Sequence, residues 1–168
     1  PIAHVESGVR SFNRKMPEEI NRLLVDQISE LLFTPTDSAT RNLETEGIAG
    51  AKVRQVGDVM YDASIYFGQI ADEKSDLLAQ CSLDPKSYAV ATIHREENTG
   101  DDSRLQSLVL ALEAVAEELP VIWPVHPRIS ESVKSSVLRL TQPFGYIEMQ
   151  GLIKNAQIIL TDSGGIQK

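Results

Sequence analysis

One short segment concentrates the side chains that could carry acid–base chemistry. Residues 4–22 read HVESGVRSFNRKMPEEINR, with three carboxylates, four basic side chains and one imidazole. They are His4, Glu6, Arg10, Arg14, Lys15, Glu18, Glu19 and Arg22. Two neighbouring carboxylates can serve as an acid and a base, because burial and nearby charges push their pKa values apart. A structural alternative stays open: Pro17 suits a first helical position, and Glu18 and Glu19 would then stabilise the helix dipole by about 0.3–1 kcal/mol each.

The three histidines form a second group of candidates. His4, His94 and His126 each lie at or just beyond the end of an expected strand, and Arg95 and Arg128 lie close to the last two. Ligands of parallel sheets bind at the carboxyl ends of strands, and guanidinium and imidazole donors suit phosphate oxygens. A purely structural role stays open for each histidine. Their spacing, without a cysteine partner, does not form a metal motif.

A glycine turn near the end of the chain is a candidate phosphate site. Ser163-Gly164-Gly165 follows the apolar run QIIL, and a turn between a strand and a helix exposes backbone N–H groups to an anion. Two glycines can equally be an ordinary tight turn. The sequence contains no dinucleotide-binding G-x-G-x-x-G fingerprint, no P-loop and no G-x-S-x-G nucleophile elbow.

Short apolar runs alternate with longer amphipathic stretches, which predicts an α/β fold with parallel sheets. The expected strands are 31–34, 53–56, 88–93, 121–125, 146–149 and 158–160, with Pro1-Ile2-Ala3 as the end of another. The expected helices are 17–30, 39–46, 60–78, 105–119 and 130–138. Thr36-Asp37-Ser38 offers N-cap chemistry for the second of these helices.

Composition narrows the classes of function. The net charge of −8 argues against nucleic acid and anionic membranes as partners. The single cysteine, Cys81, excludes an internal disulfide and a cysteine metal cluster. We expect a cytoplasmic protein, because no apolar run approaches the ~18 residues of a membrane span and no signal peptide is evident. Since the chain starts inside an apparent strand at Pro1 and stops at Lys168, we expect it to be the middle of a longer protein.

Five motifs together resemble the non-hydrolysing UDP-N-acetylglucosamine 2-epimerases. They are HVESGVRSFNRKMPEEINR (4–22), VGDVMYD (56–62), IHREEN (93–98), HPR (126–128) and TDSGGIQ (161–167). The matches follow the order of the family and cover nearly the whole chain. The resemblance implies two Rossmann-like parallel-sheet domains facing a cleft, the GT-B-like arrangement of many glycosyltransferases. It places the end of the first domain at residues 1–70, a linker region at 71–86 and the start of the second, UDP-binding domain at 87–168.

The resemblance also implies a reaction, the reversible conversion of UDP-GlcNAc to UDP-ManNAc by elimination and re-addition of UDP. Glu6 and Glu18 match the two acidic residues that the family has in this segment. His94 matches the active-site histidine near the diphosphate. The same likeness gives UDP-binding roles to His94, Arg10, Ser163, Gly164 and Gly165, and links Arg95 and His126 with a possible activator site. No cofactor or metal is expected, and the full-length protein is expected to be a homodimer.

Departures from the family leave alternatives open. A further catalytic aspartate and a nucleotide-contacting arginine would precede Pro1, and a ribose-contacting glutamate would follow Lys168. We therefore expect residues 1–168 alone to be inactive. Ser7-Gly8-Val9 replaces the commoner Ala-Gly-Leu. A hydrolysing 2-epimerase, a UDP-sugar glycosyltransferase of the same fold and a nucleotide-binding module without catalysis remain the competing functions.

Overall fold

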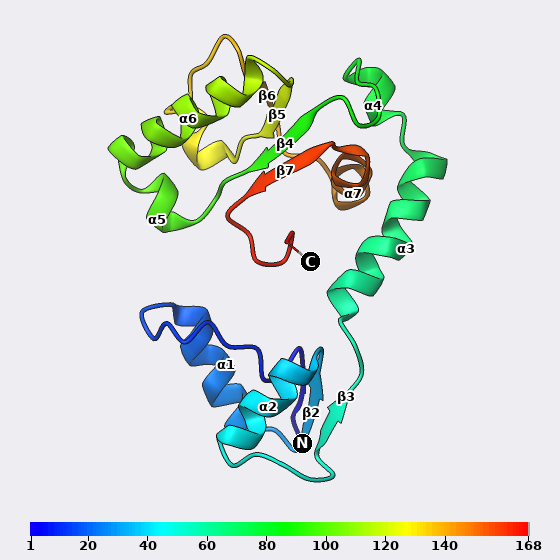
Figure 1. Ribbon diagram of the computed structural model, residues 1–168, viewed down its shortest axis with the longest axis vertical. Coiled ribbons are helices and arrows are strands. Elements are labelled where there is room, and N and C mark those ends of the chain that lie inside the picture. Colours follow the sequence, from blue (N-terminus) through cyan, green and yellow to red (C-terminus); the bar gives the residue numbers. More distant parts are fainter. Residues whose placement is uncertain (168) are drawn as a thin grey trace. The chain divides into compact units, whose positions relative to one another are not determined.

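A computed structural model describes residues 1–167 of the 168-residue chain. The chain divides into two compact units, Pro1–Ala63 and Ser64–Lys168, each built around a parallel sheet (Figure 1). This division falls inside helix α3 (Val59–Lys74), ahead of the linker region expected at 71–86. Within the described residues no helix is long and apolar enough to cross a membrane.

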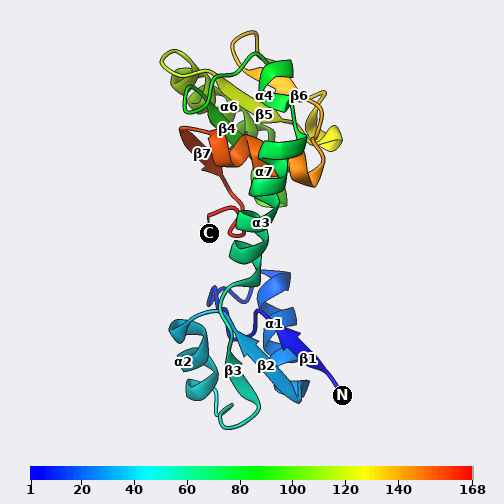
Figure 2. The ribbon, with the colours of Figure 1, turned by 90° about the vertical axis from the view of Figure 1, so that its right-hand side faces the viewer.

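The first unit is a three-stranded sheet with two helices. In chain order it contains β1 (Ala3–Val5), α1 (Pro17–Ile28), β2 (Leu31–Thr34), α2 (Asp37–Thr45) and β3 (Val53–Gln55). The strands lie in the order β1-β2-β3 and are parallel (Figure 2). The hydroxyl of Thr36 accepts a hydrogen bond from the N–H of Ala39 at 3.2 Å, which confirms the expected cap of α2. Leu32, Leu43 and Ile48 form the small core.

The second unit is a four-stranded parallel sheet covered on both faces. Its elements after α3 are α4 (Leu77–Gln80), β4 (Ala89–Thr92), α5 (Glu96–Thr99), α6 (Asp102–Ala116), β5 (Val121–Pro124), the 3-10 helix η1 (Pro127–Ile129), β6 (Arg139–Thr141), α7 (Tyr146–Asn155) and β7 (Ile158–Thr161). The strand order is β6-β5-β4-β7. The helices α6 and α7 lie on opposite sides of this sheet (Figure 1).

Side chains of the central strands pack alternately into two separate hydrophobic cores. Ala89, Ala91 and Trp123 pack on the face covered by α6, whereas Val90 and Ile122 pack on the face covered by α4 and α7. These strands are buried on both faces, as expected for a parallel sheet covered by helices. The fully buried Tyr88 hydroxyl donates to the carbonyl of Leu152 at 2.7 Å. Burial is the main cause that raises the pKa of Tyr88 to about 12, and the nearby Cys81 adds to it. The phenol therefore stays neutral.

Most of the expected strands and helices are confirmed within a few residues, but two are wrong and one expected helix is divided. Residues 130–138 are not a helix, because the Ser135 hydroxyl accepts hydrogen bonds from the N–H groups of Val137 and Leu138 and donates to Glu113. Such local bonds compete with a helix. The chain then enters strand β6, which the sequence did not indicate.

The second wrong expectation is the strand at 146–149, which is the first turn of helix α7. The Glu148 carboxylate accepts a hydrogen bond from the Gly145 N–H at 2.9 Å, which favours a helix start. Gly151, Leu152 and Ala156 are buried with helical spacing. In addition, the long helix expected over 60–78 is divided into α3 and α4.

The strand order identifies the ligand-binding edge of the second sheet. The chain passes from β4 to β5 on one side and later reaches β7 on the other side of β4. In open α/β sheets ligands bind beyond the carboxyl ends of strands where the order reverses in this way. The segments that follow β4 and β7, which begin at Ile93 and Asp162, therefore form the expected rim of a site.

Candidate active site

The acidic segment of the first unit starts with a tight turn at the carboxyl end of β1. Glu6 is half-buried and has a left-handed φ of 68°, which is uncommon for a residue other than glycine. Gly8 has a φ of 75°, and a Cβ there would lie 2.2 Å from the carbonyl oxygen of Ala39. The N–H of Ser7 donates to the Phe33 carbonyl at 3.0 Å. The turn that presents Glu6 is therefore fixed against β2 and α2.

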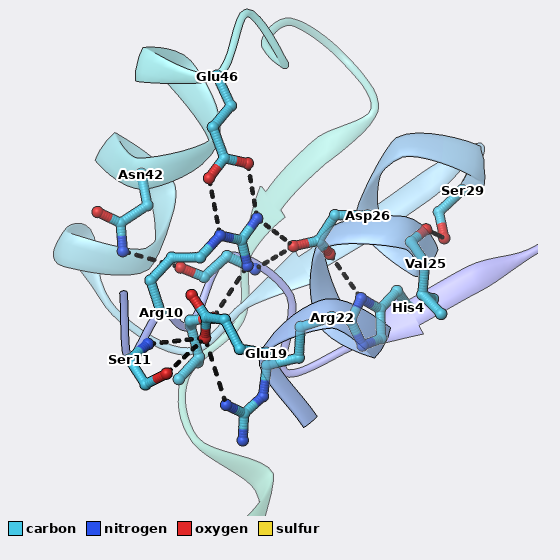
Figure 3. Close-up of polar contacts among 12 residues, drawn as sticks. His4, Arg10, Ser11, Glu19, Arg22, Val25, Asp26, Ser29, Asn42 and Glu46 are labelled. Carbon is cyan, nitrogen blue, oxygen red and sulfur yellow. Dashed lines mark hydrogen bonds and ion pairs between the residues drawn. The ribbon is translucent and has the colours of Figure 1, made fainter. Parts of the chain in front are cut away.

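Behind this turn lies a buried carboxylate, Asp26 of α1 (Figure 3). Its oxygens lie 2.6 Å from Nδ1 of His4, 3.1 Å from the N–H of Gly8 and 2.7 Å from Nη2 of Arg10. These contacts tie the end of β1, the turn and helix α1 together. His4, one of the three candidate histidines, thus takes part in holding the loop.

Arg10 is almost fully buried and occupied by protein groups. Its Nε and Nη2 donate to the two carboxylate oxygens of Glu46 at 2.8 and 2.7 Å, and its Nη1 donates to the Val9 carbonyl at 2.9 Å. The hydrogen bond to Glu46, helped by Asp26, raises the pKa of Arg10 despite its burial. With 1% of its side chain exposed, Arg10 connects α1 to α2, an arrangement that favours positioning over direct contact with UDP.

The adjacent carboxylates Glu18 and Glu19 have different environments. Glu19 is 2% exposed and accepts hydrogen bonds from the N–H of Ser11 (2.8 Å), the hydroxyl of Ser11 (2.9 Å) and the N–H of Phe12 (3.0 Å). Burial would raise the pKa of Glu19, but the bonds from Ser11 and Phe12 and the charge of Arg10 outweigh it and lower that pKa. Glu19 holds the loop, whereas Glu18 is exposed on the first turn of α1 and accessible to a ligand.

In the second unit, Asp162 joins the ends of β4 and β7. Its carboxylate accepts hydrogen bonds from the N–H groups of His94 (3.1 Å) and Arg95 (3.0 Å) and from the side chain of Asn98 (3.0 Å). The His94 ring nitrogen Nδ1 lies 3.2 Å from the same carboxylate. Partial burial would raise the pKa of Asp162, but the bonds from Asn98, Arg95 and His94 lower it. The imidazole itself is 53% exposed at this edge of the sheet.

The glycine turn follows directly after Asp162. The N–H of Ser163 donates to the Thr161 hydroxyl at 2.9 Å, and Thr161 in turn contacts the hydroxyl of Thr92 at 2.6 Å. Gly164 and Gly165 are exposed, and a Cβ at Gly164 would meet no atom within 4 Å. Asp162 thus brings His94 and the candidate phosphate turn to one edge of the sheet.

The two residues linked with an activator site lie in the loops after β4 and β5. Nδ1 of His126 accepts a hydrogen bond from the N–H of Arg128 at 3.2 Å and so caps η1. Arg128 reaches across to Glu96 with an N–O distance of 3.1 Å, which joins the two loops. The guanidinium of Arg95 lies 3.6 Å from Glu97.

The sequence alone does not reveal the acidic residues that hold these loops. Asp26, Glu46 and Asp162 have structural partners far away in the sequence, and only the position of Asp162, directly after a strand, was a usable signal. Among the described residues no group of three or more histidine, cysteine, aspartate or glutamate side chains has the arrangement of a metal site.

Comparison with known proteins places these features in a family. The family model described as UDP-N-acetylglucosamine 2-epimerase matches residues 1–168. The chain is 45% identical to a UDP-2,3-diacetamido-2,3-dideoxy-D-glucuronate 2-epimerase of Pseudomonas aeruginosa, covering 100% of this chain and 48% of the relative. It is 40% identical to a UDP-N-acetylglucosamine 2-epimerase of Methanococcus maripaludis, covering 99% and 50% respectively.

A solved structure supports the same assignment. The UDP-GlcNAc 2-epimerase of Methanocaldococcus jannaschii, in complex with UDP-GlcNAc and UDP, superimposes with a TM-score of 0.85 at 37% identity. The match covers 98% of this chain and 49% of that structure. The chain therefore spans about half the length of the relatives that it matches, in sequence and in structure.

Proposed function

The chain belongs to the UDP-N-acetylglucosamine 2-epimerase family, and we propose that the full-length protein reversibly inverts carbon 2 of UDP-GlcNAc to give UDP-ManNAc without hydrolysis. Three relationships support the proposal. The family model matches the whole chain. The two acidic candidates lie at opposite ends of one anchored loop, and His94 lies beside the glycine turn.

The proposed reaction is an elimination followed by an addition. A base removes the proton on carbon 2, the C2–H electron pair becomes the C1=C2 double bond, and the C1–O pair leaves with UDP. UDP then adds back to carbon 1 while an acid delivers a proton to the opposite face of carbon 2. The reaction therefore needs two proton-transfer groups and stabilisation of the charge that grows on the departing diphosphate.

We assign the proton transfers to the first unit. Glu6 follows β1 on a strained turn, and backbone strain of this kind is common at functional sites. Glu18 is exposed on the first helical turn, next to the buried anchor Glu19. This pairing of one fixed and one accessible carboxylate supports a catalytic role for Glu18 rather than a helix-stabilising role alone.

We assign the diphosphate to the second unit. The observation that carries this assignment is the Asp162 carboxylate, which joins His94 to the segment that begins the Ser163-Gly164-Gly165 turn. The exposed imidazole and the backbone N–H groups of the turn are donors suited to phosphate oxygens. Their place where the strand order reverses is the usual ligand position in such sheets.

The product distribution tests the proposal directly. The full-length protein incubated with UDP-GlcNAc should give UDP-ManNAc as the main product in proton and phosphorus NMR spectra. A small amount of UDP would be consistent with the elimination intermediate. Stoichiometric release of UDP and free ManNAc would instead establish a hydrolysing enzyme, and unchanged UDP-GlcNAc would reject the epimerase proposal for this substrate.

A second candidate substrate follows from the Pseudomonas aeruginosa relative, because the 45% identity to it nearly equals the 46% identity to a UDP-N-acetylglucosamine 2-epimerase homolog of Methanococcus maripaludis. We propose UDP-2,3-diacetamido-2,3-dideoxy-D-glucuronate as this alternative. The chemistry at carbon 2 would be the same, but the sugar carries an additional carboxylate. Parallel assays with the two nucleotide sugars distinguish the alternatives by their kcat/KM values.

A further inference from the structure

Hydrogen bonds hold the base of the loop between the two candidate acidic residues. Glu19 accepts hydrogen bonds from Ser11 and Phe12, and the Asn13 side chain accepts one from the Lys15 N–H at 3.1 Å. The N–H of Met16 also donates to the Asn13 carbonyl at 3.0 Å. Phe12 has a left-handed φ of 57°, and its side chain is 78% exposed. The anchored loop therefore maintains an unfavourable backbone conformation at Phe12.

The charged side chains of two of the four basic residues in this segment have no role in holding it. Arg10 is buried against Asp26 and Glu46, and Arg22 lies 4.0 Å from Glu19. Arg14 and Lys15 are exposed, and no ion pair within residues 1–167 includes either side chain. The contacts of the fold thus account for the first two cations and leave the other two for solvent or a ligand.

The position of these cations indicates what they would bind. They lie on the loop that runs from Glu6 to Glu18, in a chain with a net charge of −8. An anionic substrate held next to two carboxylates needs compensating positive charge, because like charges in one site repel. We propose that Arg14 and Lys15 contact the substrate and bind an anionic oxygen group of the nucleotide sugar, which makes them substrate-binding residues. This inference rests on the proposed function.

Two parts of a nucleotide sugar present the required anionic oxygens. One is the diphosphate, which every UDP-sugar shares. The other is a carboxylate on the sugar ring, which UDP-2,3-diacetamido-2,3-dideoxy-D-glucuronate carries and UDP-GlcNAc does not. A diphosphate contact would affect both substrates and UDP itself. A carboxylate contact would affect the uronate alone.

The test uses the full-length protein with Arg14→Gln, Lys15→Gln and the double substitution. The matched control is Arg41→Gln plus Lys52→Gln, two other basic residues of the first unit that form no ion pair within residues 1–167. KM and kcat are measured for UDP-GlcNAc and for the uronate, together with the inhibition constant of UDP. We expect the double variant to raise KM by about 10-fold to 100-fold, the usual effect of losing charge-assisted hydrogen bonds, with kcat changed less than threefold.

The outcomes separate the sources of the anion. A rise in KM for both substrates and in the inhibition constant of UDP identifies the diphosphate. A rise for the uronate alone identifies its carboxylate, and Arg14→Lys should then retain most of the affinity. Unchanged KM values for all ligands, or equal changes in the control variant, would overturn the inference while the proposed function stands. If the wild-type protein converts neither substrate, it is the proposed function that fails.

Discussion

The carboxylate of Asp162 accepts a hydrogen bond from the N–H of His94 at 3.1 Å, across 68 residues of sequence. Through this bond the end of β7 fixes the start of the loop that carries the candidate active-site imidazole. Since the pKa of Asp162 is lowered by its bonds to Asn98, Arg95 and His94, although burial opposes this, the group is a carboxylate at neutral pH. A neutral side chain of the same shape should hold the loop less well.

Asp162→Asn should therefore weaken UDP binding and lower stability. An amide can accept fewer of the hydrogen bonds that now meet at Asp162, and the loss of such bonds costs about 1–3 kcal/mol. Calorimetric titration with UDP and thermal unfolding measure the two effects. Asp101→Asn is the matched control, because Asp101 also has a lowered pKa but caps α6 through Ser103 and Arg104. Equal UDP affinity for wild type and Asp162→Asn would contradict the assignment.

Glu6→Gln and Glu18→Gln should each reduce kcat by about 10²–10⁴-fold, the usual range for a lost general acid or base. KM should change much less, because the proposed role of both carboxylates is proton transfer rather than substrate binding. Steady-state assays of the full-length protein with UDP-GlcNAc provide the comparison. Glu44→Gln, an exposed carboxylate on α2, serves as the control. Near-normal turnover in both variants would leave Glu18 with a helix-stabilising role only.

Glu19→Gln should remove a pH-dependent part of the stability. Because the folded-state pKa of Glu19 lies below its ordinary value of 4.5, its contribution is present above about pH 4.5 and is lost as the pH falls through the folded-state pKa. The difference in unfolding free energy between wild type and Glu19→Gln should be about 1–3 kcal/mol at pH 7, and it should shrink towards pH 3. Urea unfolding at several pH values measures it. A difference that stays constant over this range would show that the charge of Glu19 is not responsible.

Substitutions in the buried network around Arg10 should change the free energy of unfolding in a non-additive way. Asp26→Ala leaves the Arg10 guanidinium with one carboxylate fewer and should cost about 3–5 kcal/mol, as usual when a buried ion pair loses one partner. Adding Arg10→Met should cost less than the sum of the two single changes, because each single change already breaks the same Arg10–Asp26 ion pair. Arg41→Met on the exposed face of α2 is the control. Strict additivity in a double-mutant cycle would contradict the coupling.

The sequence predicted the parallel α/β fold because strands such as 88–93 are apolar throughout and are separated by helical patterns. It failed where polar side chains decide the local structure. At Ser135, hydroxyl bonds to the following N–H groups displace a helix from a segment with helical spacing of apolar residues. At Tyr146, the apolar and aromatic residues favoured a strand, but the bond between Glu148 and Gly145 starts a helix.

The sequence indicated which residues are candidates for the site, but not what each of them does there. Glu6 and His94 could be found from their motifs and their places after strands, and Glu18 from its motif on the first turn of a helix. The burial of Arg10 and the anchoring role of Glu19 depend on partners 36 and 8 residues away, which composition and periodicity do not reveal. The sequence therefore indicates which side chains gather at the strand ends, and the packing decides which of them remain accessible to a ligand.

Isotope exchange at carbon 2 is the decisive measurement for the proposed elimination and re-addition of UDP. The full-length protein is incubated with UDP-GlcNAc in heavy water, and deuterium at carbon 2 is followed by NMR and mass spectrometry. We predict deuterium in the UDP-ManNAc formed and, with time, in the recovered UDP-GlcNAc, with strong slowing by Glu18→Gln and none by Glu44→Gln. Epimerisation that retains the original carbon 2 proton, or exchange that persists unchanged in both Glu6→Gln and Glu18→Gln, would contradict this prediction.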